Sequence, residues 1–359
     1  EDLIARGELT ADDRQYFESR STVGYPDDLG AATLVVQSFT DRLFPANEGL
    51  ANYRWAQDNG VETALLLGNG GVHDLFGAPP PGASALDAFA QTAALDWMDA
   101  HLRDGSHDLA PVTYYDPTGE EFLELDDVPP RRAQPRTFRR SLSSARTLTG
   151  PDGGPLAIDW DIERETTLYG TPTLSLAVRP TGSGTTNLMA ALQQVTDGEA
   201  TTLEEQPMAA AVETATTLTF DLAAVQQTLA PGDRLRLALA TGSQQLTDSE
   251  FLLGQDGIFE DTSEGAGVEI QTSADIELAV PARVGPPPVL AGSPPRNPTG
   301  DGLYRDVRGD GRVDVLDVQT LFNNLGAPAV QQHARAFNFS GTDPETVTVL
   351  DVQALFDAL

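Results

Sequence analysis

The spacing of hydrophobic residues changes character along this 359-residue chain. Within residues 1–110, short apolar runs at 34–36 and 64–67 alternate with amphipathic stretches. Continuous apolar runs between helices are typical of parallel strands that are covered on both faces. From 155 to 283 apolar and polar residues alternate, as in Leu174, Leu176 and Val178. This alternation favours an antiparallel β-sandwich, so we expect a multidomain chain that begins with an α/β parallel sheet.

Changes in composition indicate where the domains end. A polar segment at 111–154 separates the α/β part, 1–110, from the sandwich at 155–284, and we expect this segment to be a solvated connector. The stretch 285–299 is rich in proline and has no hydrophobic period, which is typical of an interdomain linker. Residues 300–359 then form a separate small module.

That C-terminal module contains an internal repeat. Residues 313–325 recur as 347–359, and 9 of the 13 positions are identical at an offset of 34 residues. The first copy overlaps a 12-residue loop at 306–317, which has oxygen-bearing side chains at its positions 1, 5, 9 and 12 and glycine at position 6. This spacing is typical of a loop that wraps oxygen ligands around Ca²⁺. The candidate ligands are Asp306, Asp310, Asp314, Asp317 and the backbone carbonyl of Arg312.

The second loop, 338–351, is longer, at 14 residues, and less acidic. Its candidate ligands are Asn338, Ser340, Asp343 (or Thr342 in its place), Thr348 and Asp351. In the first loop Arg308 stands at position 3, and a guanidinium cannot ligate a cation. In so acidic a chain, an acidic turn without a metal is the alternative interpretation.

Residues 300–359 resemble the dockerin family, in which two calcium loop–helix units dock onto a cohesin partner. The resemblance implies a small α-helical dockerin with EF-hand-like calcium loops, attachment to a cohesin-type protein, and an extracellular, secreted protein. Arg308 and the length of the second loop depart from the family pattern. We therefore expect both loops to bind Ca²⁺ more weakly than is usual in the family, and the second loop especially.

Two candidate catalytic residues follow successive predicted strands. Asp41 follows the run at 34–37, and His73 follows the run at 64–67. Loops at the carboxyl ends of parallel strands build active sites, so we expect Asp41 and His73 to meet there. An acid followed by a histidine corresponds to the last two members of a Ser-Asp-His triad, in which Asp41 orients His73 and His73 acts as general base. Individually, each has a simpler interpretation as a turn or loop residue.

The chain has only three other histidines. His101 lies on the apolar face of a predicted helix, so we expect it to be packed in the core. His107 and His333 lie in polar segments and have no pattern that indicates a partner.

Residues 15–283 resemble the X-Pro dipeptidyl-peptidase and cocaine-esterase-like α/β-hydrolases. The similarity lies in residues 34–45, 68–73 and 95–102, and in the strand sequences at 169–176 and 231–237. It implies the C-terminal half of an α/β-hydrolase followed by a jelly-roll, galactose-binding-like β-sandwich. It also implies a serine hydrolase that cleaves a peptide or ester substrate through an acyl-enzyme.

One departure from this family concerns the nucleophile. No G-x-S-x-G nucleophile elbow occurs in the sequence. In the family the nucleophile precedes the acid and the base, so we expect it upstream of Glu1, on a missing N-terminal half, and we expect this chain alone to be inactive. The alternative hypothesis is a non-catalytic binding or scaffold protein whose sandwich and dockerin carry the function.

Charge limits the partners of the chain. The sequence has 22 basic and 54 acidic residues, a formal net charge of −32, and every basic residue is arginine. Nucleic acid and acidic membrane surfaces are therefore poor partners, and no apolar run reaches the ~18 residues that a membrane span requires. A surface of hydrated carboxylates without lysine favours a halophilic source, with an arginine-biased genome as the alternative.

Overall fold

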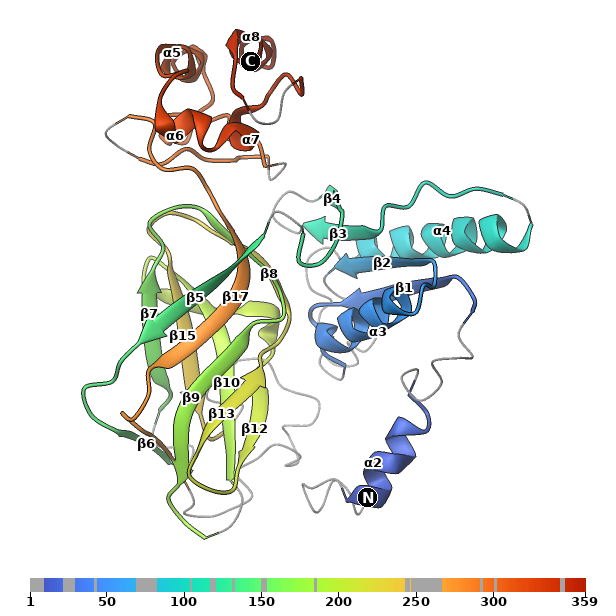
Figure 1. Cartoon of the computed structure of the whole chain (residues 1–359), viewed down its shortest axis with the longest axis vertical. Coiled ribbons are helices and arrows are strands. Elements are labelled where there is room, and N and C mark those ends of the chain that lie inside the picture. The colour runs from blue at the N-terminus through green and yellow to red at the C-terminus, as the bar shows by residue number, and fades with distance from the viewer. Residues whose placement is uncertain are drawn as a thin grey trace. The chain divides into compact units, whose positions relative to one another are not determined.

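Figure 1 shows the computed structural model of the whole chain. The chain forms two compact units. One comprises Glu1–Trp160, Tyr169–Gln227 and Leu235–Pro281. The other comprises Asp161–Leu168, Thr228–Arg234 and Ala282–Leu359. The residues that the structure describes are 10–21, 30–41, 44–68, 83–103, 105–116, 121–130, 133–149, 154–183, 186–242, 246, 267–290, 293–299, 302–342 and 346–359.

A four-stranded sheet lies in the N-terminal part of the first unit. Its strands run in the order β1 (Thr33–Ser38), β2 (Thr63–Gly68), β3 (Val112–Asp116) and β4 (Glu121–Leu125). The first three are parallel and β4 is antiparallel to β3. All of β2 after Thr63 is buried, as expected for a strand in the middle of a sheet. The prediction of parallel strands at 34–37 and 64–67 is confirmed.

Two helices pack against this sheet, α3 (Ala46–Asp58) and α4 (Ala83–Leu102), and each contacts both β1 and β2. Tyr53 of α3 is fully buried in one apolar core with Leu65 of β2. Trp97 is buried on α4. A shorter helix, α2 (Ala11–Glu18), precedes them. Within the described residues, none of the helices has the combination of length and hydropathy that crossing a membrane requires.

The segment 111–154, expected to be a solvated connector, contains strands over much of its length. Besides β3 and β4 it holds β5 (Gln134–Arg140) and β6 (Arg146–Thr149). β5 and β6 bury one apolar side chain each, Phe138 and Leu148, among polar neighbours. Their hydrophobic pattern is therefore too weak to predict strands from the sequence. They form strands because they pair with strands that are distant in the sequence, β5 with β17 and β6 with β16.

The sandwich region is formed by two sheets (Figure 1). The five-stranded sheet has the order β11-β10-β15-β7, with β12 beside β10. The eight-stranded sheet has the order β14-β8-β17-β9-β16-β6, with β13 beside β9 and β5 beside β17. The strands not yet given are β7 (Leu156–Asp161), β8 (Thr166–Gly170), β9 (Thr173–Pro180), β10 (Thr186–Thr196), β11 (Glu199–Thr202), β12 (Met208–Val212), β13 (Thr216–Asp221), β14 (Val225–Leu229), β15 (Arg234–Ala240), β16 (Gly267–Ile270) and β17 (Ile276–Val284).

The alternation in the sequence follows the two faces of these strands. Leu174, Leu176 and Val178 of β9 are fully buried. β13 and β17 pair with β9 in antiparallel register, with Leu218 opposite Leu176. The predicted antiparallel sandwich is confirmed.

In the described residues from 302 onward the helices are α5 (Val315–Asn323), α6 (Pro328–Gln331), α7 (Ala334–Phe337) and α8 (Val349–Asp357). The repeat explains α5 and α8, which begin with the same capping box. Asp314 and Thr348 are the N-caps, and Asp317 and Asp351 complete the boxes. α5 contacts α8, and the core between the helices includes Phe337.

Candidate functional site

The candidate acid Asp41 lies just beyond the carboxyl end of β1. This residue is 5% exposed, and its side-chain Oδ1 accepts a hydrogen bond of 2.9 Å from the backbone N–H of Phe44. β1 and β2 end level with each other, because Ser38 pairs with Gly68. The two strands therefore end at the same edge of the sheet, and the loop that contains Asp41 begins there. His73 lies outside the described residues.

The sandwich supplies a contact to the Asp41 loop that the sequence did not predict. Gln206, which is 4% exposed, donates from its Nε2 to the backbone carbonyl of Phe39 at 3.0 Å and also to the carbonyl of Asp41. Asn47 at the start of α3 makes a second set of contacts, accepting from the backbone N–H of Ala224 at 2.7 Å. These contacts hold the acid loop against the sandwich within the first unit.

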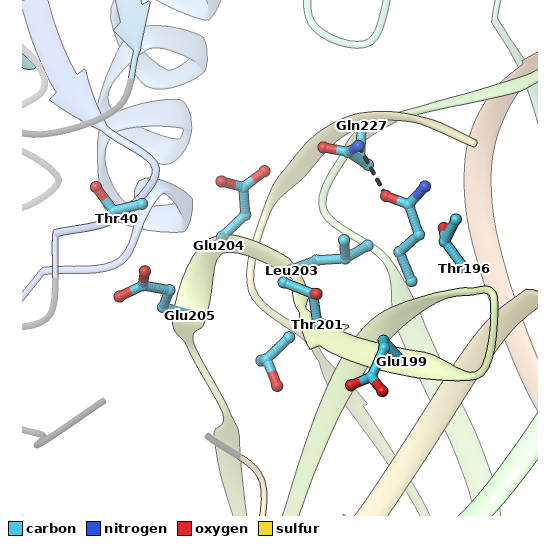
Figure 2. A pocket seen from close by; sticks show the side chains of 10 residues that line it. Thr40, Thr196, Glu199, Thr201, Leu203, Glu204, Glu205 and Gln227 are labelled. Atoms are coloured by element: carbon cyan, nitrogen blue, oxygen red, sulfur yellow. Dashed lines mark hydrogen bonds between the residues drawn. The ribbon is translucent and has the colours of Figure 1, made fainter. Parts of the chain in front are cut away.

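A polar cavity of about 370 Å³ opens beside this loop (Figure 2). Among the described residues that line it, Thr40, the neighbour of Asp41, is the one outside the sandwich region. The short helix η3 (Leu203–Glu205) contributes Glu204 and Glu205, both with a φ of 54°. The other lining residues are Gln194, Thr196, Glu199, Thr201, Thr202, Leu203 and Gln227. Asp41 itself does not line the cavity.

Burial raises the pKa of Glu204 to about 8. The backbone N–H of Gln226 opposes this by donating to the carboxylate at 3.3 Å, while the negative charge of Glu205 raises the pKa further. Glu204 is therefore largely protonated at neutral pH and can donate a hydrogen bond in the cavity.

The first candidate calcium loop brings its carboxylates together, but around an arginine. Arg308 Nη2 lies 2.5 Å from Asp310 Oδ2 and 3.3 Å from Asp314 Oδ2, and Arg308 Nε lies 3.6 Å from Asp317 Oδ1. Asp306 instead accepts the backbone N–H groups of Asp310 and Gly311. The guanidinium therefore pairs with carboxylate oxygens that a calcium ion would need as ligands. In this conformation of Arg308 the first loop fits Ca²⁺ poorly. Arg312 is exposed, and its backbone N–H donates a hydrogen bond of 3.1 Å to Asp310 Oδ1.

The second loop fits a cation better. Asn338 Oδ1 is buried without a hydrogen-bond partner among the described residues, and it stands at the first ligand position. Asp351 Oδ1 accepts from the Ser340 backbone N–H at 3.0 Å, and its Oδ2 accepts from that of Thr348 at 2.7 Å. Asp343 lies outside the described residues.

The acidic residues that close the two loops differ in their pKa. Burial raises the pKa of Asp317 more than its hydrogen bonds lower it. Burial also acts to raise the pKa of Asp351, but hydrogen bonds from Ser340 and Thr348 outweigh it and leave that pKa below its ordinary value. The second loop therefore favours a charged carboxylate at its last position more than the first loop does.

The described part of the chain combines a mainly parallel α/β sheet with an antiparallel β-sandwich. No family model matches the sequence, and no curated protein matches it significantly. A CocE/NonD family hydrolase from Staphylococcus aureus has a TM-score of 0.56 and 13% identity over 75% of this chain and 57% of that chain.

Two further solved structures have similar folds. An aminopeptidase from a marine sediment Thaumarchaeota archaeon has a TM-score of 0.58 and 11% identity, covering 78% of this chain and 59% of that chain. An α-amino acid ester hydrolase has a TM-score of 0.50 and 12% identity, covering 79% of this chain and 60% of that chain. The chain therefore spans less than two thirds of the length of each of these hydrolases, and what it shares with them is the fold.

Proposed function

We propose that this chain supplies the acid and the base of a serine hydrolase that cleaves a peptide or an ester through an acyl-enzyme. The observation that carries the proposal is the position of Asp41, which is buried just beyond the carboxyl end of β1. The fold that contains this sheet is similar to that of a solved CocE/NonD family hydrolase. In the proposed mechanism Asp41 orients His73, which removes the proton from a serine hydroxyl and later protonates the leaving group. The serine comes from a segment that precedes residue 1, as the missing elbow motif suggests.

A comparison of the chain with and without that preceding segment tests this proposal. The 359-residue chain alone should not hydrolyse p-nitrophenyl esters or X-Pro p-nitroanilides above a mock-purified background, and addition of the segment should restore activity. In the restored enzyme His73→Ala should lower kcat/KM by roughly a thousandfold or more, and Asp41→Asn should lower it with the fold intact. Asp58→Asn, an exposed carboxylate on α3, is the matched control.

Two outcomes would contradict the proposal. One is hydrolysis by the restored enzyme that survives His73→Ala, which would place the chemistry on other residues. The other is failure of any preceding segment to restore hydrolysis. That result would favour a non-catalytic binding or scaffold protein, the alternative that the absence of an elbow serine supports.

We propose further that α5 and α8 attach the protein to a cohesin-type partner. Equivalent positions of the repeat expose large apolar side chains on both helices, namely Val315 and Val349, Leu316 and Leu350, and Phe322 and Phe356, each 45–58% exposed. Exposed apolar groups that recur by symmetry are typical of interaction surfaces. In this proposal the two candidate loops hold Ca²⁺, which fixes the start of each helix, and Arg308 weakens the first site.

Retention of the full chain on immobilised cohesin domains tests this attachment. We expect binding in Ca²⁺ and loss of binding in EDTA. The double substitution Leu316→Asp and Leu350→Asp should abolish binding, because it places charge on both apolar faces. Leu95→Asp, which alters an exposed leucine on α4, should leave binding intact. Equal retention in Ca²⁺ and EDTA, or retention by the double variant, would contradict the proposal.

A further inference from the structure

Two of the four histidines in the chain converge on one glutamate. Glu62 immediately precedes β2, His101 lies in the last turn of α4, and His107 lies between α4 and β3. All three therefore lie near the amino ends of β2 and β3. Asp41 follows the carboxyl end of β1, which is parallel to β2, so this cluster lies at the opposite end of the strands from Asp41.

The spacing of the three side chains matches that of metal ligands. Glu62 Oε1 lies 3.7 Å from His101 Nε2 and 3.4 Å from His107 Nε2, and the three ligand atoms all lie within 4.8 Å of one another. These separations are long for hydrogen bonds, which are strongest at about 2.7–3.2 Å. Ligands about 2.0–2.2 Å from a tetrahedral zinc ion lie roughly 3.3–3.6 Å apart. We propose that Glu62, His101 and His107 bind a single divalent transition-metal ion of the zinc class.

The donor set selects the kind of metal. Imidazole nitrogens favour Zn²⁺, Ni²⁺ and Cu²⁺, whereas Ca²⁺ and Mg²⁺ require mainly oxygen ligands. The side chain of Glu62 is 61% exposed, which leaves room for water to complete the coordination. The formal charge of −32 also raises the local concentration of cations around the chain.

Trp97 holds the two imidazoles in place. Its ring centroid lies 4.5 Å from that of His101 and 4.6 Å from that of His107, and Trp97 is buried. Glu62 is anchored through its backbone carbonyl, which accepts the N–H of Thr33 at 2.8 Å. This positioning lowers the entropic cost of bringing the ligands together.

The surroundings of His107 set the expected affinity. Its Nδ1 is buried and has no hydrogen-bond partner in the described part of the chain. Metal-bound histidines usually donate from their second nitrogen to an oxygen acceptor, and loss of that contact costs 10–100-fold in affinity. We therefore expect the site to bind Zn²⁺ about 10–100-fold more weakly than it would if His107 Nδ1 had such an acceptor.

Calorimetric titration of the tag-free full chain with ZnCl₂ tests the site. Excess Mg²⁺ and Ca²⁺ should be present, so that carboxylates elsewhere are already occupied. We expect one zinc ion per chain, a rise in melting temperature that EDTA reverses, and partial quenching of tryptophan fluorescence when Cu²⁺ replaces Zn²⁺, because Trp97 is one of three tryptophans in the chain. Glu62→Gln and His107→Gln should each weaken binding at least tenfold.

The controls are His333→Gln and Glu48→Gln, which alter a histidine and an exposed glutamate that are not members of the cluster and should leave zinc binding unchanged. Circular dichroism checks that each variant is folded. If His107→Gln does not fold, the exposed Glu62→Gln decides the matter. Zinc binding that is unchanged in Glu62→Gln, or absent from the wild-type chain, would overturn the proposal and leave a histidine–glutamate ion pair.

Discussion

Gln206 donates a side-chain hydrogen bond to the backbone carbonyl of Asp41, although 165 residues separate the two. Both residues are buried. The same amide nitrogen donates to the carbonyl of Phe39. The sandwich therefore helps to determine the position of the candidate catalytic acid.

Removal of this amide should destabilise the chain. Gln206→Ala leaves two buried carbonyl groups without their donor, so we expect the free energy of unfolding to fall by about 1–3 kcal/mol. Urea denaturation followed by circular dichroism measures the change. Gln15→Ala, at an exposed glutamine on α2, is the control and should change stability little. Equal stability of both variants would mean that the contact contributes nothing.

The stability of the fold should depend on the protonation of Glu204. Its pKa is about 8 in the fold, against 4.5 for an ordinary glutamate. Between these pH values the unfolded chain has lost a proton that the folded chain keeps, so this group's contribution to stability falls as the pH rises from about 4.5 to about 8, and it levels off above that.

Glu204→Gln removes this penalty. The variant should be as stable as the wild type near pH 4.5 and more stable near pH 8.5, by about 1–3 kcal/mol. Thermal melting at the two pH values measures the difference. Glu199→Gln, at an exposed position that lines the same cavity, is the matched control. A gain in stability of Glu204→Gln that is the same at both pH values would contradict the assignment.

Arg308 should limit calcium binding by the first loop. Arg308→Asn replaces the guanidinium with an oxygen ligand at loop position 3, so Ca²⁺ affinity should rise by about tenfold or more. Without Ca²⁺ the variant should be less stable than the wild type, because its carboxylates have lost their counter-charge. Isothermal titration and melting curves measure the two effects.

Arg312→Asn is the control, because only the backbone carbonyl of residue 312 is a candidate ligand. It should change neither quantity appreciably. Unchanged calcium affinity in Arg308→Asn would mean that this loop does not bind the ion.

Gly267 should not tolerate a side chain. A Cβ at this position would lie 2.3 Å from the backbone carbonyl oxygen of Leu148, which pairs with β16 in the eight-stranded sheet. Gly267→Ala must therefore separate β6 from β16, and we expect a loss of about 2–4 kcal/mol in the free energy of unfolding. Gly242→Ala meets no atom within 4 Å and is the control. Similar stability of the two variants would contradict the close packing.

Salt should stabilise the protein. With a net charge of −32 and no lysine, carboxylate repulsion is strong at low ionic strength and is screened at high salt. The melting temperature should therefore rise markedly from low to molar NaCl. Sucrose, which carries no charge, controls for effects that do not depend on screening. A flat or falling melting temperature would contradict the halophilic interpretation.

Features set by local periodicity were predictable from the sequence. The apolar runs at 34–37 and 64–67 predicted β1 and β2, and the alternation at 174–178 predicted a strand of the sandwich, β9. The repeat predicted matching helices, which begin at Val315 and Val349. In each case the hydrophobic pattern that predicts the element can be read within one short segment. The reason is that the backbone geometry of a helix or strand determines which of its side chains lie on the same face.

Only the tertiary structure decided which distant groups meet. The sequence placed His101 in the core and gave His107 no partner, yet both lie beside Glu62 because α4 returns the chain to the edge where β2 begins. Tertiary packing likewise brings Gln206 to the backbone carbonyl of Asp41 and places the Arg308 guanidinium beside the carboxylate of Asp310. Such contacts depend on how sheets, helices and loops pack in three dimensions, and hydrophobic periodicity carries no information about that packing.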